Sequence, residues 1–156
     1  MITVSYVLSD DPLLLREQGR VNLGKAELVD LCYSCFGGDL TLKVNDVDLS
    51  IVTGGGVQIL DFAVGFFSAG RTLASGENAR IDFAGLADEI HLVPSGDSVR
   101  VVANYVDGST EVPRAELVSA SRKFLTEVLM DLGGRHPDLR RNKNLKKVYA
   151  WVGLRP

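Results

Sequence analysis

The sequence predicts one α+β domain, with a mostly antiparallel sheet of about six strands packed against two main helices. Three observations support this fold class. Short segments that alternate between apolar and polar residues recur along the chain, as half-buried strands require. Two longer segments, residues 57–76 and 113–132, carry apolar residues at helical spacing. Several alternating segments also follow one another across short turns, which favours antiparallel pairing.

The composition limits the class of protein. A chain of 156 residues suits a single domain, residues 1–156, and 46% hydrophobic residues can form a core without disulfides or a metal. No apolar run approaches the roughly 18–20 residues of a membrane helix. The N-terminus lacks a signal-peptide pattern, and two cysteines do not make an extracellular disulfide framework. We expect a cytoplasmic bacterial protein with no cofactor and no membrane contact.

The first expected element is a strand in ITVSYVL, which alternates from Ile2 onward. Residues 10–19, DDPLLLREQG, follow as a turn and an irregular or short helical piece.

The stretch CYSCFGGD, residues 32–39, fits two structures. Leu28, Leu31, Cys32 and Cys35 have helical spacing, with Gly37 as a possible C-cap. Alternatively, Gly37-Gly38 forms a hairpin turn and the two arms sort into faces. One face then holds Leu31, Tyr33, Cys35, Leu40, Leu42 and Val44. We favour the hairpin because LTLKV is plainly a strand and the segment is rich in β-forming residues.

The hairpin decides the chemistry of the two cysteines. Side chains three residues apart on a strand point to opposite faces, so Cys32 and Cys35 could not share a metal or form a disulfide. A zinc site also lacks a second cysteine pair, since the two histidines stand alone at 91 and 136. A redox site would need the first cysteine at a helix N-terminus. We therefore expect no metal site.

A turn at residues 45–50 leads to a short strand, and Gly54-Gly55-Gly56 leads into the helix of residues 57–76. The glycines are not followed by the Lys-Ser/Thr of a phosphate-binding loop, so a simple joint is the better interpretation. Gly65 and Gly70 should allow this buried helix a close approach to the sheet. Asp61 either favours the helix dipole or is a buried carboxylate with a raised pKa.

Residues 79–83, 89–93 and 99–105 alternate and predict a meander. Pairing Ile81 with Ile90, and Val93 with Ser98, gives a register for the three strands. One row of the outer face then holds Arg80, His91 and Arg100, and the neighbouring row holds Asp82, Glu89 and Val102. The first row could bind a phosphate or carboxylate, or be a solvated charge ladder with Arg–carboxylate pairs.

The helix of residues 113–132 should start at Pro113 and stop at Gly133-Gly134. The basic C-terminal segment, residues 135–156, has seven Lys/Arg and one Asp, a charge of +6 against −9 for the remainder. Its apolar residues predict a short helix docked on the acidic body. It lacks the aromatic interleaving of a nucleic-acid module, so nucleic acid is not the expected partner.

The element order, with the phrases FGGDLTLKV, LDFAVGFF and IDF–EIHLV–VRVVANY, resembles small bacterial α+β immunity proteins of polymorphic toxin systems. The resemblance spans most of residues 28–132 and carries over no functional residue. It implies a non-enzymatic protein that binds one toxin and blocks it, often through an acidic surface. The candidate contact residues are therefore acidic: Asp39, Asp46, Asp48, Asp82, Asp88 and Glu89.

Two other function classes stay open. The alternative is an anion-binding protein or small phosphoryl-handling enzyme built on Arg80, His91 and Arg100. A structural or self-associating module is the third class, and the sequence leaves the oligomeric state open. No catalytic residue is predicted, since the chain has no Gly-x-Ser-x-Gly elbow or paired-carboxylate motif.

Overall fold

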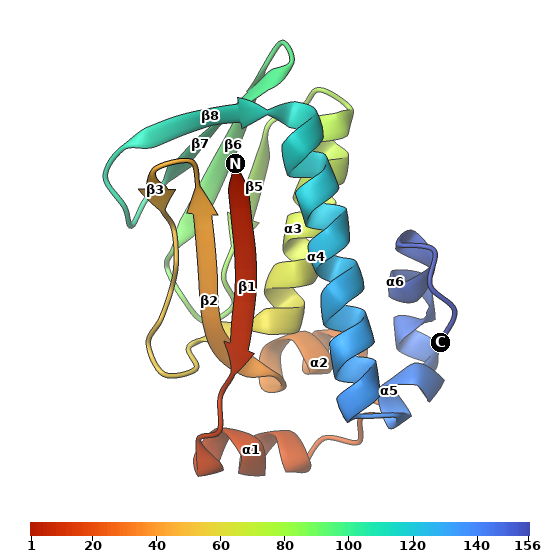
Figure 1. The fold of residues 1–156 in the computed structure, drawn as a ribbon. Coiled ribbons are helices and arrows are strands. Elements are labelled where there is room, and N and C mark those ends of the chain that lie inside the picture. The colour runs from red at the N-terminus through yellow and green to blue at the C-terminus, as the bar shows by residue number, and fades with distance from the viewer.

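The chain forms two antiparallel four-stranded sheets and six α-helices in a computed structural model that describes residues 1–156 (Figure 1). The first sheet contains β1 (Ile2–Leu8), β2 (Gly37–Val44), β3 (Val47–Asp48) and β4 (Val57–Gln58). The second contains β5 (Ala79–Asp82), β6 (Glu89–Ser95), β7 (Ser98–Ala103) and β8 (Ser109–Pro113). The α+β class and antiparallel pairing are confirmed, and the single sheet of about six strands is wrong. A long helix follows β4 in the chain, and the strands after it form their own ladder.

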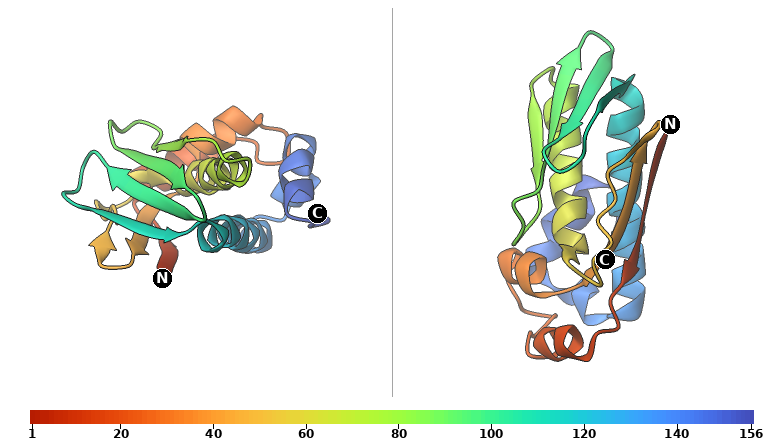
Figure 2. Two further views of the ribbon diagram at one scale, coloured as in Figure 1. Left: turned by 90° about the horizontal axis from the view of Figure 1, so that it is seen from above. Right: turned by 90° about the vertical axis from the view of Figure 1, so that its left-hand side faces the viewer.

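The two main predicted helices are present. The helical elements are α1 (Pro12–Gly19), α2 (Leu28–Ser34), α3 (Ile59–Ala74), α4 (Arg114–Arg135), α5 (Asp138–Arg141), the 3₁₀ turn η1 (Lys143–Leu145) and α6 (Lys146–Trp151). The α4 helix continues through Gly133-Gly134, so the predicted stop at these glycines is wrong. Both sheets lie on one side of the α3–α4 pair, and the C-terminal helices lie on the other (Figures 1 and 2). None of the helices has the length and apolar character needed to cross a membrane.

The meander is confirmed, with one register error. β5 pairs with β6 as predicted, with Ile81 opposite Ile90. β6 and β7 are shifted by two residues, because Ser95 rather than Val93 lies opposite Ser98. The turn is therefore tighter than expected, and Gly96 takes a φ of 60° there. A shift of two residues keeps every side chain on its predicted face but changes its cross-strand neighbours.

The predicted hairpin at Gly37-Gly38 is wrong. Residues 28–34 form α2, so the helical stripe that competed with the hairpin is the correct interpretation of this stretch. The partner of β2 is instead β1, with Leu40 opposite Tyr6. The sorting of apolar residues into one hairpin face was accidental, because the helix buries Leu31 and Cys32 and leaves Tyr33 exposed.

The junction between α2 and β2 depends on Phe36. Its φ of 62° lies in the left-handed region, which turns the chain from the helix into the strand. The Phe36 N–H donates to Gln18 Oε1 at 3.0 Å, and its ring is fully buried beside His136. Gly37 therefore starts β2 instead of capping the helix.

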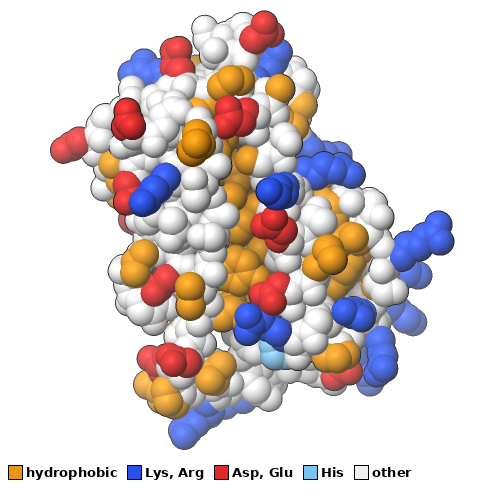
Figure 3. All heavy atoms as spheres, in the orientation of Figure 1, with side chains coloured by type: hydrophobic (Ala, Val, Ile, Leu, Met, Phe, Trp, Pro, Cys, Tyr) orange, Lys and Arg blue, Asp and Glu red, His pale blue; other side chains and the backbone are white.

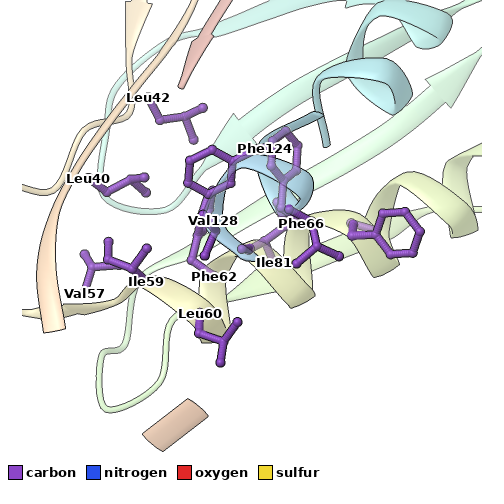
Figure 4. Packing of buried hydrophobic residues seen from close by; sticks show 14 of the residues in the cluster. Leu40, Leu42, Val57, Ile59, Leu60, Phe62, Phe66, Ile81, Phe124 and Val128 are labelled. Atoms are coloured by element: carbon purple, nitrogen blue, oxygen red, sulfur yellow. The ribbon is translucent and has the colours of Figure 1, made fainter. Parts of the chain in front are cut away.

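One hydrophobic cluster of 37 buried residues joins both sheets to the helices. Its centre holds Phe62 of α3 and Phe124 of α4, with ring centroids 5.6 Å apart, and Leu40 of β2 points toward them (Figure 4). The sheets also meet at Asn45, whose Nδ2 donates to Thr110 Oγ1 and Glu111 O, both at 2.8 Å.

The basic C-terminal segment docks on the body, as predicted. Buried Asn142 donates from Nδ2 to Leu23 O at 2.8 Å and Ala26 O at 2.9 Å. The Trp151 ring stacks on Phe67 with centroids 5.8 Å apart. Besides Asn142, the buried residues of the C-terminal segment are Leu139, Leu145, Val148, Tyr149 and Val152.

Candidate functional site

Acidic side chains gather where β5 turns into β6. Asp82 lies directly opposite Glu89 in the ladder, and Asp88 precedes Glu89 in the chain. Asp82 Oδ1 lies 3.1 Å from Arg80 Nε, and Glu89 Oε2 lies 3.0 Å from His91 Nε2. Three of the predicted contact residues therefore share one edge of the second sheet.

Asp48, from the first sheet, joins this group through Tyr105. The Tyr105 hydroxyl donates to Leu49 O at 2.8 Å. Burial raises the pKa of Tyr105, and the charges of Asp88 and Asp48 raise it further. The charges of Asp48 and Asp88, which are 40 positions apart in the chain, therefore both act on this hydroxyl.

Asp61 lies beside the same group, in the first turn of α3. Its Oδ2 accepts a hydrogen bond from the Ala84 N–H at 3.3 Å. Burial raises the pKa of Asp61, the Ala84 hydrogen bond partly offsets this, and Asp82 adds a further increase. Both sequence hypotheses therefore apply in part, because Asp61 lies in the first turn of α3 and is also a half-buried carboxylate with a raised pKa. Asp61 forms no salt bridge.

We call Asp48, Asp61, Asp82, Asp88 and Glu89 the acidic band. The cations next to it are Arg80, paired with Asp82, and Lys43, which lies opposite Asp48. The band is therefore strongly negative and runs from the β3 turn to the start of α3.

A groove of about 620 Å³ opens beside the band, between α3 and β5. Asp61, Gly65 and Ser68 line it from the helix, and residues 78–85 line it from the strand and the following turn. Tyr33 of α2 also lines the groove, and this residue is 58% exposed. Asp61 and Asp82 are the carboxylates that line the groove, and of the two only Asp82 forms a salt bridge, with Arg80.

The two other predicted acidic residues lie elsewhere. Asp39 Oδ1 accepts three backbone hydrogen bonds. The donors are the N–H groups of Thr53 at 3.2 Å, Gly54 at 3.0 Å and Gly55 at 2.9 Å. The glycine loop is therefore an anion nest that the chain fills with its own carboxylate. Positive φ values at Gly54 and Gly55 aim the N–H groups inward. Asp46 is exposed in the β2–β3 turn and accepts no hydrogen bond.

The predicted row of Arg80, His91 and Arg100 is incomplete. Arg80 and His91 are cross-strand neighbours, but the register shift puts Val102 beside His91 and moves Arg100 opposite Val93 and Glu111. The Arg80 and His91 side chains also contact carboxylates, as described above. The geometry therefore favours the charge-ladder interpretation of these residues over an anion site.

A second groove, of about 510 Å³, runs between β1 and α4, and the sequence did not predict it. Figure 3 shows it as an apolar furrow with charged side chains along one rim. The Tyr6 hydroxyl donates to Asp131 Oδ2, and Asp131 Oδ1 accepts from Arg135 Nε at 2.9 Å. Burial is the main reason that the pKa of Tyr6 is raised. Asp131, the carboxylate on the rim of this groove, is thus already paired with Tyr6 and Arg135.

Basic side chains cover the outer surface of the C-terminal segment, on the side away from the sheets (Figure 3). The ion pairs of this segment are Arg135 with Asp131 and Arg141 with Asp138. The segment therefore docks through its apolar residues and Asn142 and leaves its charges facing outward.

The cysteines are free and buried, and burial raises the pKa of Cys32 to about 12 and of Cys35 to about 11. The prediction that the two cysteines lie on opposite faces of a sheet is wrong, because Cys32 belongs to α2 and Cys35 directly follows it. No group of three or more His, Cys, Asp or Glu side chains is arranged to hold a metal ion.

No protein family, curated protein or solved structure matches this chain.

Proposed function

We propose that the protein binds a cationic protein partner through the acidic band and blocks it, as immunity proteins block bacterial toxins. The observation that carries the proposal is the acidic band beside one groove, which Asp61 and Asp82 line, with Asp61 lacking a cation.

Two physical effects support this role. An acidic surface speeds encounter with a cationic partner, and it penalises acidic competitors. Nuclease toxins carry basic surfaces because they must approach phosphates. A protein that offers carboxylates to such a surface occupies the same groups that the nucleic acid would occupy.

The test is co-expression with a candidate toxin domain, chosen from any toxin gene that lies next to the gene of this chain. We expect the chain to restore growth of cells that express the toxin, and to co-purify with it. The variant Asp82→Lys/Glu89→Lys should slow association about tenfold at low salt, and the defect should shrink at high salt because the charges are exposed.

The matched control is Asp10→Lys/Asp97→Lys, which changes the same charge at exposed positions outside the band. Far-UV circular dichroism checks that both variants fold. Absence of growth rescue and of a complex would refute the proposed function. If the chain restores growth but the Asp82→Lys/Glu89→Lys variant associates with the toxin at an unchanged rate, the interface lies on another face.

A further inference from the structure

The groove between α3 and β5 borders an open sheet edge. β5 is the terminal strand of the second sheet, and its only partner is β6. An open edge presents backbone N–H and C=O groups that another extended segment can pair with. The direction of each group follows from the hydrogen-bond pattern of the neighbouring strands.

The Asn104 N–H donates to Glu89 O, so the odd-numbered residues of β6 bond to β7. In an antiparallel ladder the bonding direction alternates along the strand. Ile90 therefore bonds toward β5 and exchanges hydrogen bonds with Ile81. It follows that the backbone groups of Arg80 and Asp82 point to the open edge.

Ala84 lies in the turn two residues beyond the end of β5, and its N–H is the donor to Asp61 Oδ2. The Asp61 carboxylate thus lies at the end of the open edge, where a segment added along β5 would end its pairing. A side chain of that segment would lie within reach of the carboxylate.

We infer that the groove receives an extended basic segment of the protein partner, which pairs with the β5 edge and places a Lys or Arg side chain against Asp61. The inference rests on the proposed function, because it names the part of the partner that the acidic band holds.

Charge complementarity selects a basic occupant. Asp61 has no cation, and Arg80, the cation that lines the groove, is paired with Asp82 at 3.1 Å. A lysine or arginine would neutralise a half-buried carboxylate that is costly to leave alone in its charged form. The chain's own basic segment, residues 135–156, is not the occupant, because buried Asn142 holds it against Leu23 and Ala26.

The helix side of the groove has room for the occupant. No atom lies within 4 Å of where a Cβ on Gly65 would stand. Ser68 and Thr72 follow Gly65 along the same wall, and their side chains are short. A large side chain at position 65 would therefore fill the groove without altering any charge.

The probe is an eight-residue peptide that alternates threonine and lysine, with a threonine–glutamate peptide as its charge-reversed counterpart. Backbone amide NMR of the ¹⁵N-labelled chain locates the contact, and fluorescence anisotropy measures affinity. We expect the lysine peptide to shift the amide signals of Arg80, Asp82 and Ala84. The glutamate peptide should leave them unchanged.

Two variants disturb the groove differently. Asp61→Asn removes the charge, and Gly65→Phe fills the space. Each should weaken the lysine peptide about tenfold, the loss expected for one partly desolvated charge pair or a blocked pocket. Asp46→Asn, an exposed change outside the band, should alter the affinity less than about twofold. Retained amide spectra show that the variants fold.

Shifts scattered over the acidic band, or equal affinity of the Asp61→Asn variant, would overturn the inference. So would concentration-dependent dimerisation that shifts the same amides without peptide, because a second copy would then occupy the edge. The two proposals also fail separately. If wild type, Asp61→Asn and Gly65→Phe all neutralise the toxin equally, the groove is not used and the proposed function stands. If the peptide binds as expected but no toxin is neutralised, the proposed function alone fails.

Discussion

Gly70 of α3 and Ser121 of α4 lie so close together that a Cβ on Gly70 would overlap Ser121 Oγ. Ser121 is buried and donates from Oγ to Val118 O at 2.8 Å. Gly70 therefore allows a close approach between helices, whereas the sequence suggested an approach to the sheet. Gly65, on the same helix, faces open space.

These two glycines should respond oppositely to alanine. Gly65→Ala should raise the free energy of unfolding by about 0.5–1 kcal/mol, because alanine restricts the unfolded chain and meets no neighbour. Gly70→Ala should lower it by about 1–3 kcal/mol through overpacking against Ser121. Urea denaturation measures both. A stabilising Gly70→Ala would contradict the close approach of α3 and α4.

Asp61 should make stability depend on pH. Its folded pKa lies above the ordinary value of 3.8, so the folded state binds this proton more tightly than the unfolded state does. The contribution of Asp61 to stability therefore falls as the pH rises from 3.8 through the raised pKa, and it stays low at higher pH.

The variant Asp61→Asn escapes this loss because it is neutral at every pH. It should gain stability relative to wild type across the same window, by less than about 1 kcal/mol because solvent screens a half-exposed group. Thermal unfolding at a series of pH values measures the difference, with Asp10→Asn as the exposed control. A constant difference at all pH values would show that the Asp61 pKa is not raised.

Asp39 should be important for stability rather than for partner binding. Asp39→Ala leaves three N–H groups of the glycine loop without their acceptor, so we expect a loss of about 2 kcal/mol. Asp46→Ala removes the same charge from an exposed turn and should change stability by less than about 0.5 kcal/mol. Chemical denaturation of the two variants checks this, and equal losses would mean that the nest contributes nothing.

The cysteines should be unreactive in the folded protein. Thiolates are the reactive form, and burial raises the pKa of Cys32 to about 12 and of Cys35 to about 11. We expect a disulfide reagent at neutral pH to modify neither thiol within minutes, and both thiols at once in denaturant. Absorbance of the released thiolate follows the reaction. Rapid modification of the native protein would indicate that α2 opens readily.

Local patterns were sufficient for much of the fold. The α3 and α4 helices were predictable because residues such as Phe62, Phe66 and Phe124 repeat at helical spacing wherever a helix buries one side. The register of β5 on β6 was also predictable, since a short turn leaves few ways to pair adjacent strands. The acidic set was named from composition, and three of its members lie together because they flank that turn.

The rest depended on contacts between residues far apart in the chain. Backbone hydrogen bonds have the same chemistry at every residue, so the sequence of β2 does not specify that β1 rather than residues 31–36 lies beside it. The contact of Asp61 with Ala84, and that of Tyr105 with Leu49, likewise arise from how two sheets pack on α3. Residue patterns therefore identified the two main helices and most strands, whereas the packing of distant segments created the groove and the environment of Asp61.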